Sequence, residues 1–205
     1  MGKLVIFVVS TVLVFVVLAV VVFLAADYLF NREVDKEVEE FYMGVENHHQ
    51  VIREADLNRL PAAVQNWLRY AQVIGKEKIV AARTKQKVEL RLEQDKPRMP
   101  AKAEQYFRTE EPGFIWKVKI NAAPFFHIVG RDKYCDGHGN MLIKIMSIKT
   151  IADARGPEID QGTLLRYLAE TMWFPTAALS DYIEWEEIDT QLIINSDIEL
   201  ATINL

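Results

Sequence analysis

A run of 23 residues without a charge, residues 4–26 (LVIFVVSTVLVFVVLAVVVFLAA), constrains this chain more than any other feature. Eighteen of these residues are Leu, Ile, Val or Phe. As a helix the run would be about 35 Å long, enough to cross a hydrocarbon core of about 30 Å. We therefore predict that residues 1–26 are a tilted, uncleaved transmembrane anchor of a single-pass protein of the cell membrane.

A cleaved signal peptide is the alternative interpretation, because Lys3 precedes the run and Ala25 and Ala26 end it. The apolar part of a signal peptide normally has about 7 to 15 residues, and Leu24 stands where cleavage favours a small residue. Lys3 and the free amine favour a cytoplasmic N-terminus. The body is therefore expected to lie outside the cytoplasm, in the cell envelope.

The body that follows the anchor is acidic. Lys3 is the only charged residue in 1–26, so 24 − 1 = 23 basic and 29 acidic residues remain, a net charge of −6. This balance argues against a nucleic-acid partner. The single cysteine, Cys135, cannot form an internal disulfide, and a buried, unreactive thiol is its simplest interpretation.

The sequence carries no metal-ligand spacing, nucleophile elbow or phosphate-binding loop, so we expect no metal and no cofactor. His48 and His49 are adjacent and would point about 100° apart on a helix, which prevents them from sharing one metal. His138 could bind a metal together with Asp136, but both lie in a predicted tight turn, and exposed turn residues are the favoured interpretation.

Residues 27–57 are predicted to be an amphipathic helix or connector. Apolar residues recur there at spacings of three and four, typical of one helix face: Val34, Val38, Phe41, Val45, His48 and Ile52. The stripe forms either a short coiled-coil stalk or a surface that packs on the body. We favour packing on the body.

Residues 58–205 are expected to form one α+β domain. Pro61 and Gly75 bracket a predicted helix. Apolar and polar residues alternate at 87–93 and 114–120, which predicts strands, and DGHGN at 136–140 predicts a turn between two more. Residues 142–151 are apolar on both faces of their predicted strand, so we expect cover on both sides, either from helices or around a cavity that holds an apolar ligand.

Strands are predicted again from residue 182 onward, and the chain ends within the last of them, at Leu205. An antiparallel sheet that ends in this way would leave an exposed edge strand. We therefore suspect that the domain is truncated at its C-terminus.

The stretch DARGPEID, residues 153–160, gathers more groups capable of chemistry than any other segment. In a structural interpretation Asp160 caps a helix that begins near Gln161, and Asp153 or Glu158 pairs with Arg155. In an enzymatic interpretation Asp153, Glu158 or Asp160 would serve as the acid and base of a hydrolase. The sequence favours the structural interpretation, because each residue already has a local reason to be present.

Two binding interpretations also compete. Arg155, with Arg131 and Arg166, would form the polar end of an apolar pocket for a lipid, since guanidinium groups suit phosphate and carboxylate. Alternatively, the loop and the last strand would dock another envelope protein. The residues proposed for recognition are Arg155, Glu158, Asp160, Arg131 and Arg166, with Trp116 and Trp173 as the apolar candidates.

Six segments occur in succession along the chain: LPAAVQNWLRYA, MPAKAEQYF, PGFIWKVKI, GRDKYCDGHGNMLIK, DARGPEIDQGTLLRYLAETMWFPTA and WEEID. Together they resemble a bacterial family of unknown function whose members often carry an N-terminal membrane segment. The similarity covers roughly residues 60–190, and its most distinctive part is DARGPEIDQGTLLRYLAE. The resemblance implies a fold similar to the half-barrels of periplasmic lipoprotein carriers, an antiparallel sheet curled around helices. Members usually continue for several more strands. We therefore expect a membrane-anchored envelope protein, without assigned catalysis, that binds a lipid or other apolar ligand.

Overall fold

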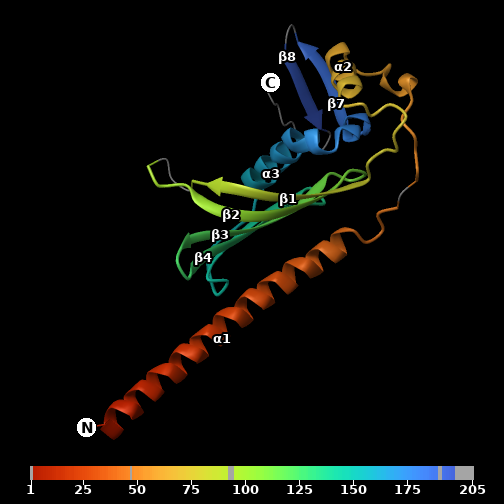
Figure 1. Cartoon of the computed structure of the whole chain (residues 1–205). Coiled ribbons are helices and arrows are strands. Elements are labelled where there is room, and N and C mark those ends of the chain that lie inside the picture. The colour runs from red at the N-terminus through yellow and green to blue at the C-terminus, as the bar shows by residue number, and fades with distance from the viewer. Residues whose placement is uncertain (1, 47, 92–94, 189–190, 197–205) are drawn as a thin grey trace.

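A computed structural model of the chain shows an α+β fold, with two helices on opposite faces of one curved antiparallel sheet (Figure 1). The structure describes residues 2–46, 48–91, 95–188 and 191–196. The expected fold class is confirmed. The sheet is a simple meander of consecutive strands, β1 (Ala81–Leu90), β2 (Met99–Arg108), β3 (Gly113–Ala123), β4 (Phe126–Cys135), β5 (His138–Ile145) and β6 (Lys149–Ala154).

Helix α1 (Gly2–Phe41) is one continuous helix with two different environments along its length. Residues 4–24 extend away from the body with exposed side chains, so this part is not the core helix of a soluble protein (Figure 1). Near the N-terminus, α1 is long and apolar enough to cross a membrane. Its C-terminal part lies along the sheet.

The C-terminal part of α1 packs on one face of the sheet through Phe30, Val34 and Phe41, which are at most 4% exposed. Their partners on the sheet are Tyr106, Ile115 and Val129. Successive residues of a strand alternate between the two faces of a sheet. Tyr106 of β2 and Ile115 of β3 are directly opposite each other, and both side chains lie on the face that α1 covers. The prediction that the stripe packs on the body is confirmed for this part of α1.

The prediction of one helix as far as Ile52 is wrong. The helix ends at Phe41, and Gly44 follows in a turn with φ of 82°, a conformation that favours glycine. Val45 and His48 are therefore not on a helix. Ile52 packs instead with Leu57 and Leu68, in a separate cluster.

Helix α3 (Pro157–Ala169) covers the other face of the sheet. Its Leu164, Tyr167 and Leu168 pack in a core with Phe107 and other sheet residues. The turn between β4 and β5 contains Asp136 and Gly137, both at positive φ, which confirms the turn predicted there. Because α1 lies on one face and α3 on the other, the two-sided cover expected for β5 is also confirmed.

The predicted apolar strand extends too far, however. Residues 146–148 form a turn between β5 and β6, and Ile148 and Ile151 are about half exposed, at 49% and 50%. Met146 and Ser147 adopt positive φ values of 52° and 60°, which reverse the chain. The two isoleucines therefore lie in the turn and on an edge strand.

The remaining elements form a small layer beside α3 (Figure 1). They are the short helical turns η1 (Glu54–Leu57), η2 (Glu170–Trp173) and η3 (Pro175–Leu179), α2 (Ala62–Tyr70), and a separate hairpin of β7 (Ile183–Ile188) and β8 (Gln191–Ser196). Pro61 immediately precedes α2, as predicted, but the helix ends at Tyr70, five residues before Gly75. The expectation that the domain is truncated concerns residues 197–205, which lie outside the described residues.

Candidate functional site: a lysine-lined groove

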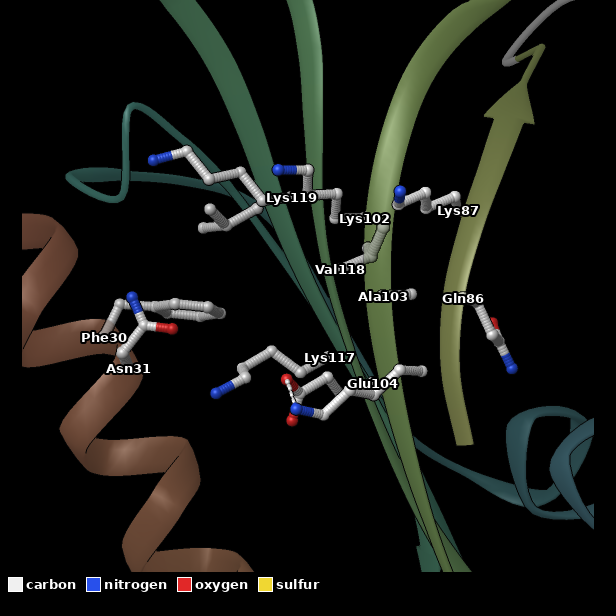
Figure 2. Close-up of a pocket in the computed structure, with 12 residues that line it drawn as sticks. Phe30, Asn31, Gln86, Lys87, Lys102, Ala103, Glu104, Lys117, Val118 and Lys119 are labelled. Atoms are coloured by element: carbon white, nitrogen blue, oxygen red, sulfur yellow. Dashed lines mark ion pairs between the residues drawn. The ribbon is translucent and has the colours of Figure 1, made fainter. Parts of the chain in front are cut away.

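A groove of about 410 Å³ lies between α1 and the face of β1, β2 and β3 that α1 covers (Figure 2). Phe30 and Asn31 form its wall on α1. The sheet side carries five lysines and one glutamate: Lys85, Lys87, Lys102, Lys117, Lys119 and Glu104. Its volume is in the usual range for small-molecule sites, and its charge suits an anion.

The charges in the groove form two rows across the three strands, and the rows differ. In the first row Lys85 is opposite Glu104, and Glu104 is opposite Lys117, so that the signs alternate. In the second row Lys87 is opposite Lys102, and Lys102 is opposite Lys119 (Figure 2). Directly opposed side chains lie about 5 Å apart at Cβ, where like charges destabilise a sheet. We call Lys87, Lys102 and Lys119 the lysine row.

Glu104 is already committed to partners other than the lysine row. It accepts a hydrogen bond from the Tyr106 hydroxyl at 2.7 Å and pairs with Arg83 at 2.6 Å. The Tyr106 hydrogen bond, followed by the Arg83 charge, lowers the pKa of Glu104 although burial opposes this. Within the described residues, Lys87 and Lys102 form no ion pair. The second row therefore retains positive charge that the first row does not.

Lys102→Glu is expected to stabilise the fold, because it would give the second row the alternating charges of the first. Two cross-strand pairs at about 0.2–1 kcal/mol each predict a gain of about 1 kcal/mol in the free energy of unfolding. Urea denaturation of the full chain in nonionic detergent, monitored by circular dichroism, would measure it. A loss of stability would mean that the lysines of this row do not repel one another.

Asp27 fixes one end of the groove to the sheet. It is the first charged residue after the apolar run, and it pairs with Lys119 of β3. Its carboxylate also lies 2.7 Å from His127 Nε2 and accepts a hydrogen bond from Ser147. Burial opposes ionisation of Asp27, but these three partners outweigh it and lower the pKa. Asp27 is therefore ionised at neutral pH.

The residues of the 153–160 loop are engaged separately. Arg155 is exposed and lies 3.5 Å from Asp153, which also accepts a hydrogen bond from Asn140 at 2.7 Å. Glu158 is exposed in the first turn of α3. The contacts of Asp153 with Arg155 and Asn140 are typical of a structural loop.

Asp160 does not cap its helix. The helix begins at Pro157, after Gly156 with φ of 114°, so Asp160 lies within it. Its carboxylate instead accepts a hydrogen bond from the Gly139 amide at 2.6 Å. A Cβ at Gly139 would approach the Ile159 carbonyl oxygen to 2.6 Å, so glycine permits this close contact. Asp160 thus ties α3 to the start of β5.

The three arginines expected in one pocket do not share a site. Arg131 is buried on the face covered by α1, where it lies 3.0 Å from Glu37. Through Asn140 it is linked to Asp153, the partner of Arg155. Arg166 lies on the opposite face, because its partner Asp132 follows Arg131 in β4 and points the other way.

The two tryptophans also have different environments. Trp116 is half buried beside Arg166, whose guanidinium lies 4.7 Å from its ring centroid. Trp173 is 54% exposed. Of the residues singled out in the sequence, Arg166 and Trp116 are thus brought together, whereas Trp173 stands apart from them.

Sequence reasoning missed a cluster of charged and polar residues around Arg166. Arg166 lies 2.9 Å from Asp132 and 3.2 Å from Glu170, and Glu170 accepts a hydrogen bond from the fully buried Gln105. Burial raises the pKa of Asp132, although Arg166 opposes the shift. The sequence did carry a signal for this cluster. Asp132 shares one face of its strand with Gly130 and Tyr134, and a charged residue at such an inward position needs a partner.

Cys135 and His138 have ordinary structural environments. Burial, with the hydrogen bond to Asp136, raises the pKa of Cys135 to about 11. His138 lies 3.6 Å from Asp160, not in a pair with Asp136. The described residues contain no group of three or more His, Cys, Asp or Glu side chains that could hold a metal ion.

Fold and groove together define an α+β protein with an N-terminal apolar helix that docks on a curved antiparallel sheet. The chain belongs to the family of unknown function DUF6544, whose sequence model matches residues 50–195. No curated protein and no solved structure matches the chain. The lysine row lies within the matched region, whereas the groove wall from α1 precedes it.

Proposed function

We propose that this chain is a single-pass, membrane-tethered protein of the cell envelope that binds the anionic headgroup of an amphiphile in the lysine-lined groove. The phosphate or carboxylate of the ligand contacts the lysine row. Its apolar chains follow the exposed apolar surface of α1 into the bilayer. The body lies outside the cytoplasm, an orientation supported by Lys3 and the N-terminal amine.

The observation that carries this proposal is the lysine row itself. Lys119 pairs with Asp27, but Lys87 and Lys102 form no ion pair within the described residues and are directly opposed, which costs stability. The neighbouring row shows that this sheet accommodates alternating charges. A bound anion offsets the repulsion, and ammonium groups are good phosphate ligands. The row therefore makes physical sense as a binding site and poor sense as a purely structural surface.

The position of the groove supports a lipid rather than a soluble anion. Lys119 pairs with Asp27, directly after the apolar run, and Phe30 and Asn31 line the groove within the next turn of α1. If residues 4–26 cross the bilayer, the lysine row lies at the height of the headgroups. Each lysine near an anionic membrane surface contributes about 1 kcal/mol to binding.

Native mass spectrometry of the full chain tests the proposal. The chain is released from nonionic detergent micelles that contain either phosphatidylglycerol or phosphatidylcholine. We expect preferential retention of phosphatidylglycerol. Loss of two lysine contacts in Lys87→Gln/Lys102→Gln removes about 2 kcal/mol, so affinity should fall about 30-fold.

The matched control is Arg53→Gln/Lys76→Gln, which removes two charges from exposed residues outside the groove. It should retain phosphatidylglycerol as the wild type does. Equal losses in both double variants would mean that net charge alone governs binding. Equal retention of both lipids by the wild type would contradict an anion site. Soluble glycerol phosphate, added as a competitor, distinguishes headgroup recognition from recognition of a whole lipid.

A further inference from the structure

Two hairpin turns of the sheet are fastened to α1 at the point where its apolar run ends. One is the β3–β4 turn, residues 123–126, and the other is the β5–β6 turn, residues 146–148. Asp27 holds both, because it pairs with His127 next to the first turn and accepts a hydrogen bond from Ser147 in the second. The Met146 amide also donates to the His127 carbonyl at 3.0 Å. We call these two turns the hairpin rim.

The rim points toward the N-terminal end of α1. A Cβ at Gly113, the first residue of β3, would lie 2.9 Å from Phe41 at the end of the helix. Further along β3, Lys117 pairs with Asp35, and Lys119 pairs with Asp27. Strand and helix therefore run in opposite directions (Figure 1). By this register the β3–β4 turn lies beyond Asp27, on the side of the apolar run.

The depth of the rim follows from this register. His127 is level with Asp27, since 2.7 Å separates their side chains. Phe125 is two residues away, which is at most about 7 Å along the strand. Seven ångströms correspond to between four and five residues of helix, so Phe125 lies between the levels of Asp27 and about Val22 of α1. For a spanning α1, that is the boundary between headgroups and acyl chains.

The side chains of the rim suit this boundary. Phe125 is 99% exposed and has φ of 62°, a conformation that is costly for a bulky residue. Ile148 is 49% exposed in the other turn. Tyr28 of α1 is exposed just after Asp27, and Lys149 is exposed next to Ile148. Aromatic residues concentrate at membrane interfaces, and lysine favours anionic headgroups.

We infer that the hairpin rim docks on the bilayer that α1 crosses, with Phe125 and Ile148 in the interfacial layer. This inference rests on the membrane tether of the proposed function but not on headgroup binding in the groove. It gives the exposed phenylalanine an apolar environment and holds the body upright against the membrane. The lysine row then faces the headgroups at fixed height.

Spin labels on the full chain in bilayers that contain phosphatidylglycerol test this inference. Cys135→Ser removes the native thiol, and single labels are introduced by Phe125→Cys, Val16→Cys and Tyr70→Cys. Val16 lies in the apolar run, and Tyr70 is 88% exposed on α2, outside the rim. Collisions with apolar oxygen and with a polar nickel chelate report the depth of each label.

We expect oxygen to be favoured over the chelate at Val16 and at Phe125, and the reverse at Tyr70. A label at Phe125 that is as open to the chelate as the one at Tyr70, with Val16 still in the acyl chains, would overturn the docking and leave the anchor intact. Chelate access at Val16 as well would overturn the anchor and the docking together. Lipid binding in the groove is read separately, from the native mass spectra.

Discussion

Phe107→Ala is expected to lower the free energy of unfolding by about 3–5 kcal/mol, because it would leave a cavity at the centre of the aromatic core. Phe107 of β2 is fully buried, and its ring lies 4.6 Å from that of Phe174 and 6.4 Å from that of Phe114, centroid to centroid. These rings connect the sheet to the small layer of η2, η3 and β7. A loss of that size is a large fraction of the about 5–15 kcal/mol that stabilises an ordinary domain.

The matched control is Phe125→Ala, in which the same side chain is removed from the most exposed phenylalanine of the body. In detergent without a bilayer it should change the free energy of unfolding by no more than about 0.5 kcal/mol. Chemical denaturation monitored by circular dichroism measures both variants. Similar small effects for the two would contradict the aromatic core described above.

Arg166→Met is expected to cost about 3 kcal/mol, because it would leave Asp132 and Glu170 without their shared cation. The guanidinium also lies over the rings of Phe114 and Trp116, at 5.0 Å and 4.7 Å from their centroids. Methionine keeps much of the apolar stem of arginine but lacks its charged guanidinium group. The loss should therefore be electrostatic in origin rather than a packing defect.

The pH dependence of Arg166→Met follows from Asp132. Burial raises the pKa of Asp132 above its unfolded value, so the carboxyl group favours folding at low pH and loses that contribution as the pH rises through the folded pKa. Without Arg166, which opposes this shift, the folded pKa rises further. The destabilisation should thus be larger near neutral pH than in mild acid.

Asp132→Asn/Arg166→Met is the second variant of this pair. It removes the buried carboxylate together with its partner and should be more stable than Arg166→Met alone. If the single and double variants were equally stable at every pH, the cluster would act through packing and not through charge.

The class of fold was predictable because its patterns are local. Alternating residues at 114–120 predicted β3, and the turn residues at 136–140 predicted the β4–β5 turn. The helical stripe after the anchor was correctly predicted as far as Phe41 and wrongly beyond it. Helical spacing alone does not reveal that a glycine with positive φ, Gly44, ends the helix.

The lysine row was not predictable, because it depends on strand register. Alternation places Lys87 and Lys119 on polar faces of their strands, but only the pairing of β1, β2 and β3 brings Lys102 between them. The groove also needs α1 as its second wall. By contrast, the separation of Arg131 from Asp132 was predictable. The two residues are adjacent in one strand, so their side chains point to opposite faces of the sheet.

The bound-lipid content of Lys102→Glu is the measurement that tests the proposed anion site most directly, because stability and binding should change in opposite directions. Native mass spectra of the full chain, from micelles containing phosphatidylglycerol, would be compared with those of the wild type. We expect a folded, more stable protein that has lost phosphatidylglycerol. A folded variant that keeps wild-type amounts of the lipid would contradict the assignment of the lysine row as the headgroup site.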